Sequence, residues 1–210
     1  GHGHSHGQGG HACEHEHQRE DETGQEWSLY RYIDTPHATC LNERERGSAM
    51  HVFKPYDERL STDKFIQSNS GDEQLILYVP FTGSVKVAGI VVIGGNDGMA
   101  PATLKVWRNR NDIDFSNADH ARPDQVFQLN EDFNGTIEYR PKLSKFSNVE
   151  SLTLYFPDNF GADSTRIYYV GLKGSCKMLR RDPVDIVYEV VPQMKDHKTK
   201  ADQFTPSQVL

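Results

Sequence analysis

Residues 149–156, VESLTLYF, and residues 165–174, TRIYYVGLKG, contain the pattern that decides the fold. In the first stretch Leu152, Leu154 and Phe156 occur at every second position, which places their side chains on one face of a half-buried strand. Both stretches are short and rich in β-branched and aromatic residues, which favour strands. We therefore predict a core strand at each position.

Runs of the same kind recur between turn residues along most of the remaining chain. No window of helical length has apolar residues with a period of 3.6, so no helices are expected between the strands. Eight or nine short strands predict an all-β sandwich or barrel that is mostly antiparallel. Asn134-Gly135 is the strongest hairpin signal among them. The further predicted strands cover residues 27–33, 74–81, 84–94, 102–107, 125–129, 136–140 and 184–191.

Composition divides the chain into three parts. Residues 1–26 are rich in Gly, His and acids with only two hydrophobic residues, so we predict a disordered leader. Residues 27–191 are predicted to form one β domain, in which residues 34–72 make long ordered loops with a helical turn near Cys40. Residues 192–210 are predicted to be a polar tail that hangs free or lies along the domain surface.

Charge and hydropathy exclude several classes of partner. The formal net charge is −7, and the first 26 residues contribute −5 of it through six acids and one arginine. The near-neutral remainder lacks the basic surface that a nucleic acid would need. No stretch approaches 18 consecutive apolar residues, and the N-terminus has no apolar segment of the signal-peptide kind. We therefore expect a soluble intracellular monomer that binds neither nucleic acids nor membranes.

The three cysteines are widely spaced and form no C-x-x-C motif. Cys13, Cys40 and Cys176 therefore predict neither a disulfide framework nor a zinc site nor a thioredoxin-type redox centre. Cys40 and Cys176 are expected to be packing residues, and a reducing compartment fits best.

Histidines are concentrated in the leader, where they are weak candidates for metal ligands. Clustered imidazoles can bind zinc, copper or nickel, but a selective site needs a scaffold that fixes its geometry. A disordered leader offers none, so no metal site and no cofactor are predicted. Gly1 and Ser5 also fit the permissive myristoylation pattern, although the acids that follow would be repelled by anionic membranes. The histidines concerned are His2, His4, His6, His11, His15 and His17.

Two loops carry alternatives to a purely structural role. The glycine-rich residues 94–98 follow a strand, but the next segment is not a helix that could hold a phosphate, so we interpret them as a connection. Residues 109–119 are rich in oxygen ligands and offer a possible calcium site, without EF-hand spacing.

No nucleophile with a base in a recognisable hydrolase context is found, so the chain is not predicted to be an enzyme.

Six stretches, in the same order along the chain, resemble the PITH domain family, whose members interact with the proteasome. The resemblance spans roughly residues 28–190, and the leader looks like that of the stand-alone family member. Relatives fused to thioredoxin carry a redox cysteine pair that is absent here. The stretches are LNE (41–43), VFKPYDER (52–59), VPFTGSVKV (79–87), FSNV (146–149), NFGAD (159–163) and TRIYYVGLKG (165–174).

This resemblance implies a jelly-roll β-sandwich of the galactose-binding-like type, in agreement with the strand count. It also implies a cytoplasmic and nuclear protein that associates with the proteasome regulatory particle. Two function classes remain open. The favoured one is a non-enzymatic protein-interaction adaptor, and the alternative is a small-ligand module of the carbohydrate-binding kind.

The candidate partner-binding residues come from loop chemistry, because the family supplies no settled binding residues. Aromatic rings, a guanidinium and a rigid proline are typical of interface anchors. The alternative is that Phe53 and Phe160 plug the ends of the sandwich while their neighbours cap turns. The first candidate set is Phe53, Lys54, Pro55, Tyr56 and Arg59, and the second is Asn159, Phe160 and Arg166.

Overall fold

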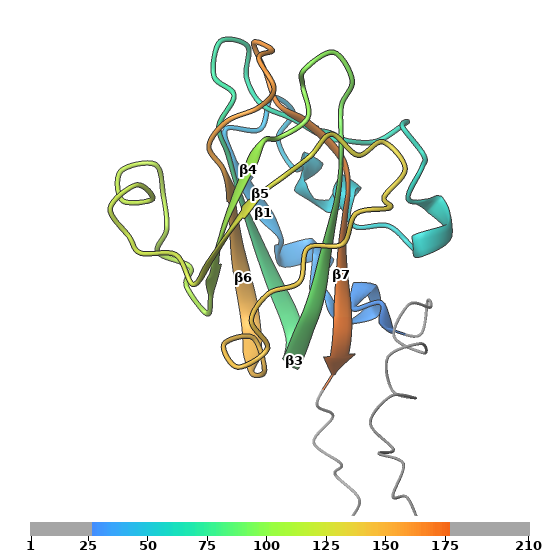
Figure 1. Ribbon diagram of the computed structural model, residues 1–210, viewed down its shortest axis with the longest axis vertical. Helices are drawn as coiled ribbons and strands as arrows, with labels where there is room; N and C mark the ends of the chain where they lie inside the picture. The colour runs from blue at the N-terminus through green and yellow to red at the C-terminus, as the bar shows by residue number, and fades with distance from the viewer. Residues whose placement is uncertain (1–26, 177–210) are drawn as a thin grey trace, which may run out of the picture. The chain divides into compact units, whose positions relative to one another are not determined.

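The two decisive stretches both form strands of an antiparallel β-structure in the computed structural model, which describes residues 27–176 (Figure 1). They correspond to β6 (Val149–Phe156) and β7 (Arg166–Cys176). Leu152, Leu154 and Phe156 are fully buried in the main core, which confirms their shared face. All strand pairs are antiparallel, as predicted.

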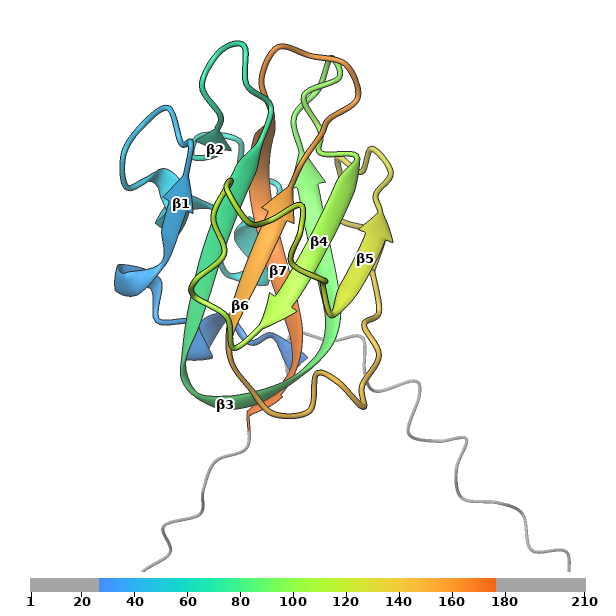
Figure 2. The ribbon, with the colours of Figure 1, turned by 90° about the vertical axis from the view of Figure 1, so that its left-hand side faces the viewer.

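One long bent strand connects the two layers of the sandwich. The predicted strands 74–81 and 84–94 are a single strand, β3 (Leu75–Gly94), whose pairing is interrupted between Pro80 and Val85. Its first part pairs with β6, and its second part pairs with β7. Figure 2 shows β3 curving at the bottom of the view and returning upward. Because of this bend, one strand contributes to both layers.

Four shorter strands complete the seven in the described residues. One layer runs β1–β3–β6–β4–β5, and the other runs β2–β7–β3. The predicted strand 184–191, the leader and the tail all lie outside the described residues. The shorter strands are β1 (Thr39–Leu41), β2 (Ile66–Gln67), β4 (Thr103–Arg108) and β5 (Gln125–Gln128).

Two predicted strands are wrong. The stretch 27–33 forms the 3₁₀ turn η3 (Tyr30–Tyr32), tied to the sandwich by single bridges from Ser28 to Lys173 and from Ile33 to Phe81. Residues 136–140 make only one bridge, between Tyr139 and Ile90. In both stretches side chains pack on the core, but the backbone makes only isolated bridges to the strands. The sequence therefore has the apolar pattern of a strand although no strand forms.

The predicted Asn-Gly hairpin is also wrong, because a buried carboxylate organises that loop. Asp132 Oδ1 accepts hydrogen bonds from the backbone amides of Asn134 and Gly135, at 3.0 and 2.9 Å, and its Oδ2 accepts from Ile137 at 2.7 Å. Gly135 has a φ of +68°, which glycine adopts without strain. The Asn-Gly pair therefore serves an Asp-centred turn that joins no two adjacent strands.

The long segment 34–72 is more regular than predicted. Cys40 itself lies in β1, and the helical turn predicted near it is a 3₁₀ turn that ends three residues before it, at His37. The segment also contains β2 and the 3₁₀ turns η4 (Thr35–His37), η5 (Ser48–Val52) and η6 (Tyr56–Glu58). The turn η4 contacts β3 and the turn η5 contacts β7, and the first set of candidate residues begins directly after η5.

Candidate functional site

The first candidate set forms the turn between η5 and η6, and its members have different roles. Phe53 is buried in the main core, so it packs the sandwich as the structural alternative expected. Lys54 is buried too, whereas Pro55, Tyr56 and Arg59 are half-buried. The turn therefore has a buried base and a partly exposed outer surface.

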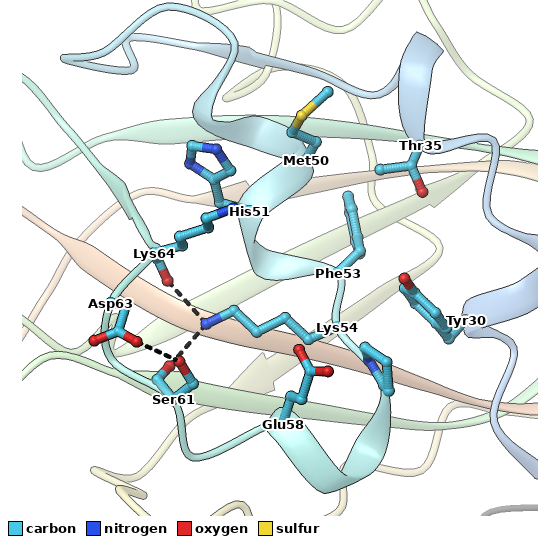
Figure 3. A pocket seen from close by; sticks show the side chains of 11 residues that line it. Tyr30, Thr35, Met50, His51, Phe53, Lys54, Glu58, Ser61, Asp63 and Lys64 are labelled. Carbon is cyan, nitrogen blue, oxygen red and sulfur yellow. Dashed lines mark hydrogen bonds between the residues drawn. The ribbon is translucent and has the colours of Figure 1, made fainter.

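Lys54 holds the loop that follows it. Its Nζ donates hydrogen bonds to the backbone carbonyls of Ser61, at 2.7 Å, and Lys64, at 2.9 Å (Figure 3). Burial lowers the pKa of the Lys54 ammonium from its ordinary value, and the nearby Asp63 and Glu58 oppose this shift. Both visible contacts are to backbone, so Lys54 fixes loop geometry rather than presenting its charge to a partner.

Tyr56 and Arg59 form one stacked unit at the outer surface. The Arg59 guanidinium lies 4.0 Å from the centre of the Tyr56 ring, and its Nη1 donates to the Tyr56 carbonyl at 3.1 Å. Arg59 Nε is buried without a hydrogen-bond partner among the described residues. Burial raises the pKa of the neighbouring Tyr169 to about 12, and the positive charge of Arg59 opposes that shift.

Two open pockets flank this turn. The first has a volume of about 410 Å³, and Figure 3 shows Met50, His51 and Tyr30 around it with Lys54 at its base. The second has a volume of about 400 Å³ and is lined by Ser28, Tyr30, Arg31, Tyr32, Pro55, Tyr56 and Asp57.

Both pockets include Tyr30 and Pro55 in their linings, and all four of Tyr30, Tyr32, Pro55 and Tyr56 line the second pocket. We call it the tyrosine groove, defined by Tyr30, Tyr32, Pro55 and Tyr56. The sequence predicts Pro55 and Tyr56 as interface residues but gives no sign that the two tyrosines of η3 lie beside them. Their stretch, WSLYRYI, is predicted as a strand, whereas it forms the 3₁₀ turn η3, and both Tyr30 and Tyr32 line the second pocket.

The second candidate set lies in the segment before β7 and at the first residue of that strand. Asn159 Oδ1 accepts from the amides of Gly161 and Ala162, at 2.9 and 3.1 Å, which shapes its loop. The Arg166 guanidinium donates to Gln67 Oε1 at 2.8 Å and lies 4.5 Å from the Phe65 ring centre.

Phe160 is the exposed member of this set, with 44% of its surface accessible, so it does not plug the sandwich. Asn159 and Arg166 therefore have evident structural roles. Within residues 27–176, none of the side-chain hydrogen bonds or ring contacts of Asn159 and Arg166 reaches the tyrosine groove.

The calcium candidate, residues 109–119, uses its oxygens internally. Asp112 pairs with Arg110, the Asp114 carboxylate accepts from the amides of Ser116 and Asn117, and Asp119 pairs with Lys105. Within residues 27–176 no three His, Cys, Asp or Glu side chains gather closely enough to hold a metal ion. The leader histidines lie outside those residues.

Solved structures resemble the described sandwich. Paired CBM32 domains of Clostridium perfringens ZmpB, in complex with GalNAc, match with a TM-score of 0.52 and 11% identity over 75% of this chain and 38% of theirs. A second ZmpB structure, which includes the M60 catalytic domain, matches with a TM-score of 0.51 and 12% identity over 75% of this chain and 16% of that one. The fold is therefore a galactose-binding-like β-sandwich.

Sequence comparison then gives the family. The PITH domain model matches residues 19–192. A PITH domain-containing protein of Drosophila melanogaster is 46% identical over 95% of both chains, and PITH domain-containing protein 1 of Homo sapiens is 42% identical over 98% of this chain and 96% of its own. This chain belongs to the PITH domain family. None of the described residues forms a helix that is both long and apolar enough to span a membrane.

Proposed function

We propose that this protein is a non-enzymatic adaptor that associates with the proteasome regulatory particle through the tyrosine groove. Membership of the PITH family supports the choice of partner. The observation that carries the choice of surface is the Tyr56–Arg59 stack, which is partly exposed beside two adjoining pockets. Aromatic and arginine side chains held beside a depression are the usual anchors of protein interfaces.

The proposal places the protein in the cytoplasm and nucleus as a monomer without a cofactor. The proposed function includes no catalytic activity. The names of the relatives denote a domain and no activity. In the described residues Cys40 is buried, and burial together with Glu43 raises its pKa well above the ordinary value, so it is a poor nucleophile at neutral pH.

Capture of proteasomes from cell lysate tests this proposal. The protein in which Tyr56→Ala is combined with Arg59→Ala should retain about ten-fold fewer regulatory particles than the unchanged chain, since anchor residues carry most of the binding energy of an interface. Phe133→Ala is the matched control, because it removes an exposed aromatic ring from a different loop. Thermal melting of each variant checks that the sandwich remains folded.

The two ways of failing are distinct. Full capture by the double variant would discard this surface and direct attention to Asn159, Phe160 and Arg166, or to residues 192–210, whose removal is the parallel experiment. If the unchanged chain retains no proteasomes, the adaptor proposal itself is wrong. A screen of glycans and calcium would then test the alternative of a small-ligand module.

A further inference from the structure

The rings of the tyrosine groove come from two separate 3₁₀ turns. Tyr30 and Tyr32 belong to η3, Tyr56 begins η6, and Pro55 precedes it. All four residues line the second pocket, and Tyr30 and Pro55 also line the first. These rings offer flat apolar surfaces to a partner, and one face of the Tyr56 ring is covered by the Arg59 guanidinium.

Within the described residues 27–176, Tyr30, Tyr32 and Tyr56 form hydrogen bonds through backbone atoms only, so their hydroxyl groups have no partner there. The Tyr139 and Tyr155 hydroxyls, by contrast, bind the Asn130 amide and the Gln74 side chain, at 2.8 and 2.6 Å. The groove therefore presents aromatic rings whose hydroxyls can donate to backbone carbonyl groups.

Both walls are fixed before any partner arrives. The η3 wall is tied to β7 by the Leu29 amide, which donates to the Leu172 carbonyl at 2.8 Å, and Leu29 is fully buried. The η6 wall is held by the Arg59 stack on Tyr56 and by the two carbonyl contacts of Lys54. A preformed groove loses little conformational entropy on binding, which favours a ligand that is itself rigid and extended.

Charge does not favour a strongly charged ligand. Lys64 and His51 share the first pocket with Glu58 and Asp63, and Arg31 in the second pocket is accompanied by Asp57. Lys54 is buried, and its ammonium is bound to carbonyls. Since the two signs are nearly balanced, an acidic or a basic peptide would gain little from the field of the groove.

We propose that the tyrosine groove binds an extended proline-rich segment in the polyproline II conformation. This inference rests on the proposed function, because the segment would belong to the protein partner. Polyproline II has no internal hydrogen bonds, so its carbonyls are available to the tyrosine hydroxyls, and its proline rings pack between aromatic rings. The described sequence contains no run of prolines, so the occupant is a segment of another chain.

A synthetic decaproline peptide, titrated into the full chain and followed by NMR, is the test. We expect saturable shifts at Tyr30, Tyr32 and Tyr56. Combining Tyr30→Ala with Tyr56→Ala should weaken the affinity about ten-fold or more, whereas Phe133→Ala should leave it unchanged. Tyr56→Phe keeps the ring and removes the hydroxyl, so it should fall between them. Thermal melting verifies that each variant is folded.

Three results would overturn the inference: no saturable shift at about 1 mM peptide, equal affinity of the double variant, or equal binding of a length-matched Gly/Ser peptide. Preference for an amphipathic helical peptide over decaproline would overturn it as well. Proteasome capture is measured in a separate experiment. Failure of the peptide titration therefore contradicts the proline-rich ligand alone, and failure of capture contradicts the adaptor function. Where both succeed, excess decaproline should lower capture by the unchanged chain.

Discussion

At the scale of single residues, Lys54 shows how a charged side chain in a recognised motif can be structural. Its type and its place in VFKPYDER suggested an interface residue, yet its ammonium lies inward against the carbonyls of Ser61 and Lys64. Sequence could not reveal this, because the carbonyls that it binds are presented by a turn whose path depends on tertiary packing. Only the outer residues of the motif remain available to a partner.

We expect Lys54→Met to lower the free energy of unfolding by about 1–3 kcal/mol, because it keeps most of the buried stem and removes two charge-assisted hydrogen bonds. Urea unfolding measures this loss. Limited proteolysis should also become faster between residues 54 and 64. Lys64→Met is the matched control, since Lys64 is exposed and contributes only its backbone carbonyl. Equal stability of the two variants would show that the Nζ contacts do not hold the loop.

Tyr169 makes stability sensitive to alkaline pH. Its pKa is raised by burial from 10.0 to about 12 in the folded protein. The stabilising contribution of the neutral phenol is therefore complete below pH 10 and is lost as the pH rises toward 12. Between pH 8 and pH 11, Tyr169→Phe should lose about 1 kcal/mol less stability than the unchanged chain.

Urea unfolding at several pH values between 8 and 11 measures that difference. Burial also raises the pKa of Tyr155 to about 12, so Tyr155→Phe should remove a further part of the alkaline loss. Parallel stability curves for Tyr169→Phe and the unchanged chain would show that Tyr169 ionises as easily when folded as when unfolded.

At the scale of elements, strands with strong alternation were predicted correctly, and the connections between them were not. Leu152, Leu154 and Phe156 follow the period of a strand and are all buried. The single strand β3 is predicted as two strands because Gly83, which lies between them, looks like a turn residue in the sequence. A bend within a strand and a turn between strands use the same residue types, so local pattern does not separate them.

Leu154→Ala in β6 is expected to cost about 2–5 kcal/mol, through lost transfer free energy and the cavity that remains. Leu154 is fully buried and lies in a strand paired on both sides, with β3 and with β4. Val126→Ala in β5 is the control, because 43% of that side chain is exposed and its loss should change stability by less than about 0.5 kcal/mol. Chemical denaturation compares them, and similar losses in both variants would contradict the core assignment.

At the scale of the whole molecule, the sandwich architecture could be predicted from sequence, whereas the groove could not. Period-two patterns and the absence of helical stripes are local properties, and they predict the class of fold. The groove instead unites Tyr30 of η3 with Pro55 and Tyr56 of a distant turn, through contacts that no local pattern encodes. Similarity to carbohydrate-binding modules at 11% identity gives the fold and leaves the ligand open.

The charge distribution over the whole chain predicts how the affinity for the proteasome depends on salt concentration. Residues 1–26 contribute −5 of the net charge of −7, so the rest of the chain is close to neutral. If the tyrosine groove carries the association with the proteasome, its affinity should change by less than about threefold between 50 and 200 mM salt, since apolar anchors are little affected by screening. Biolayer interferometry with purified regulatory particles measures this dependence.

A loss of ten-fold or more over the same range would show that long-range charge carries the association. Repeating the measurement without residues 1–26 would then locate that charge. If the salt dependence disappears with the leader, its acids are responsible. If it persists, charged residues elsewhere in the chain are responsible, and in either case the groove is not the main source of affinity.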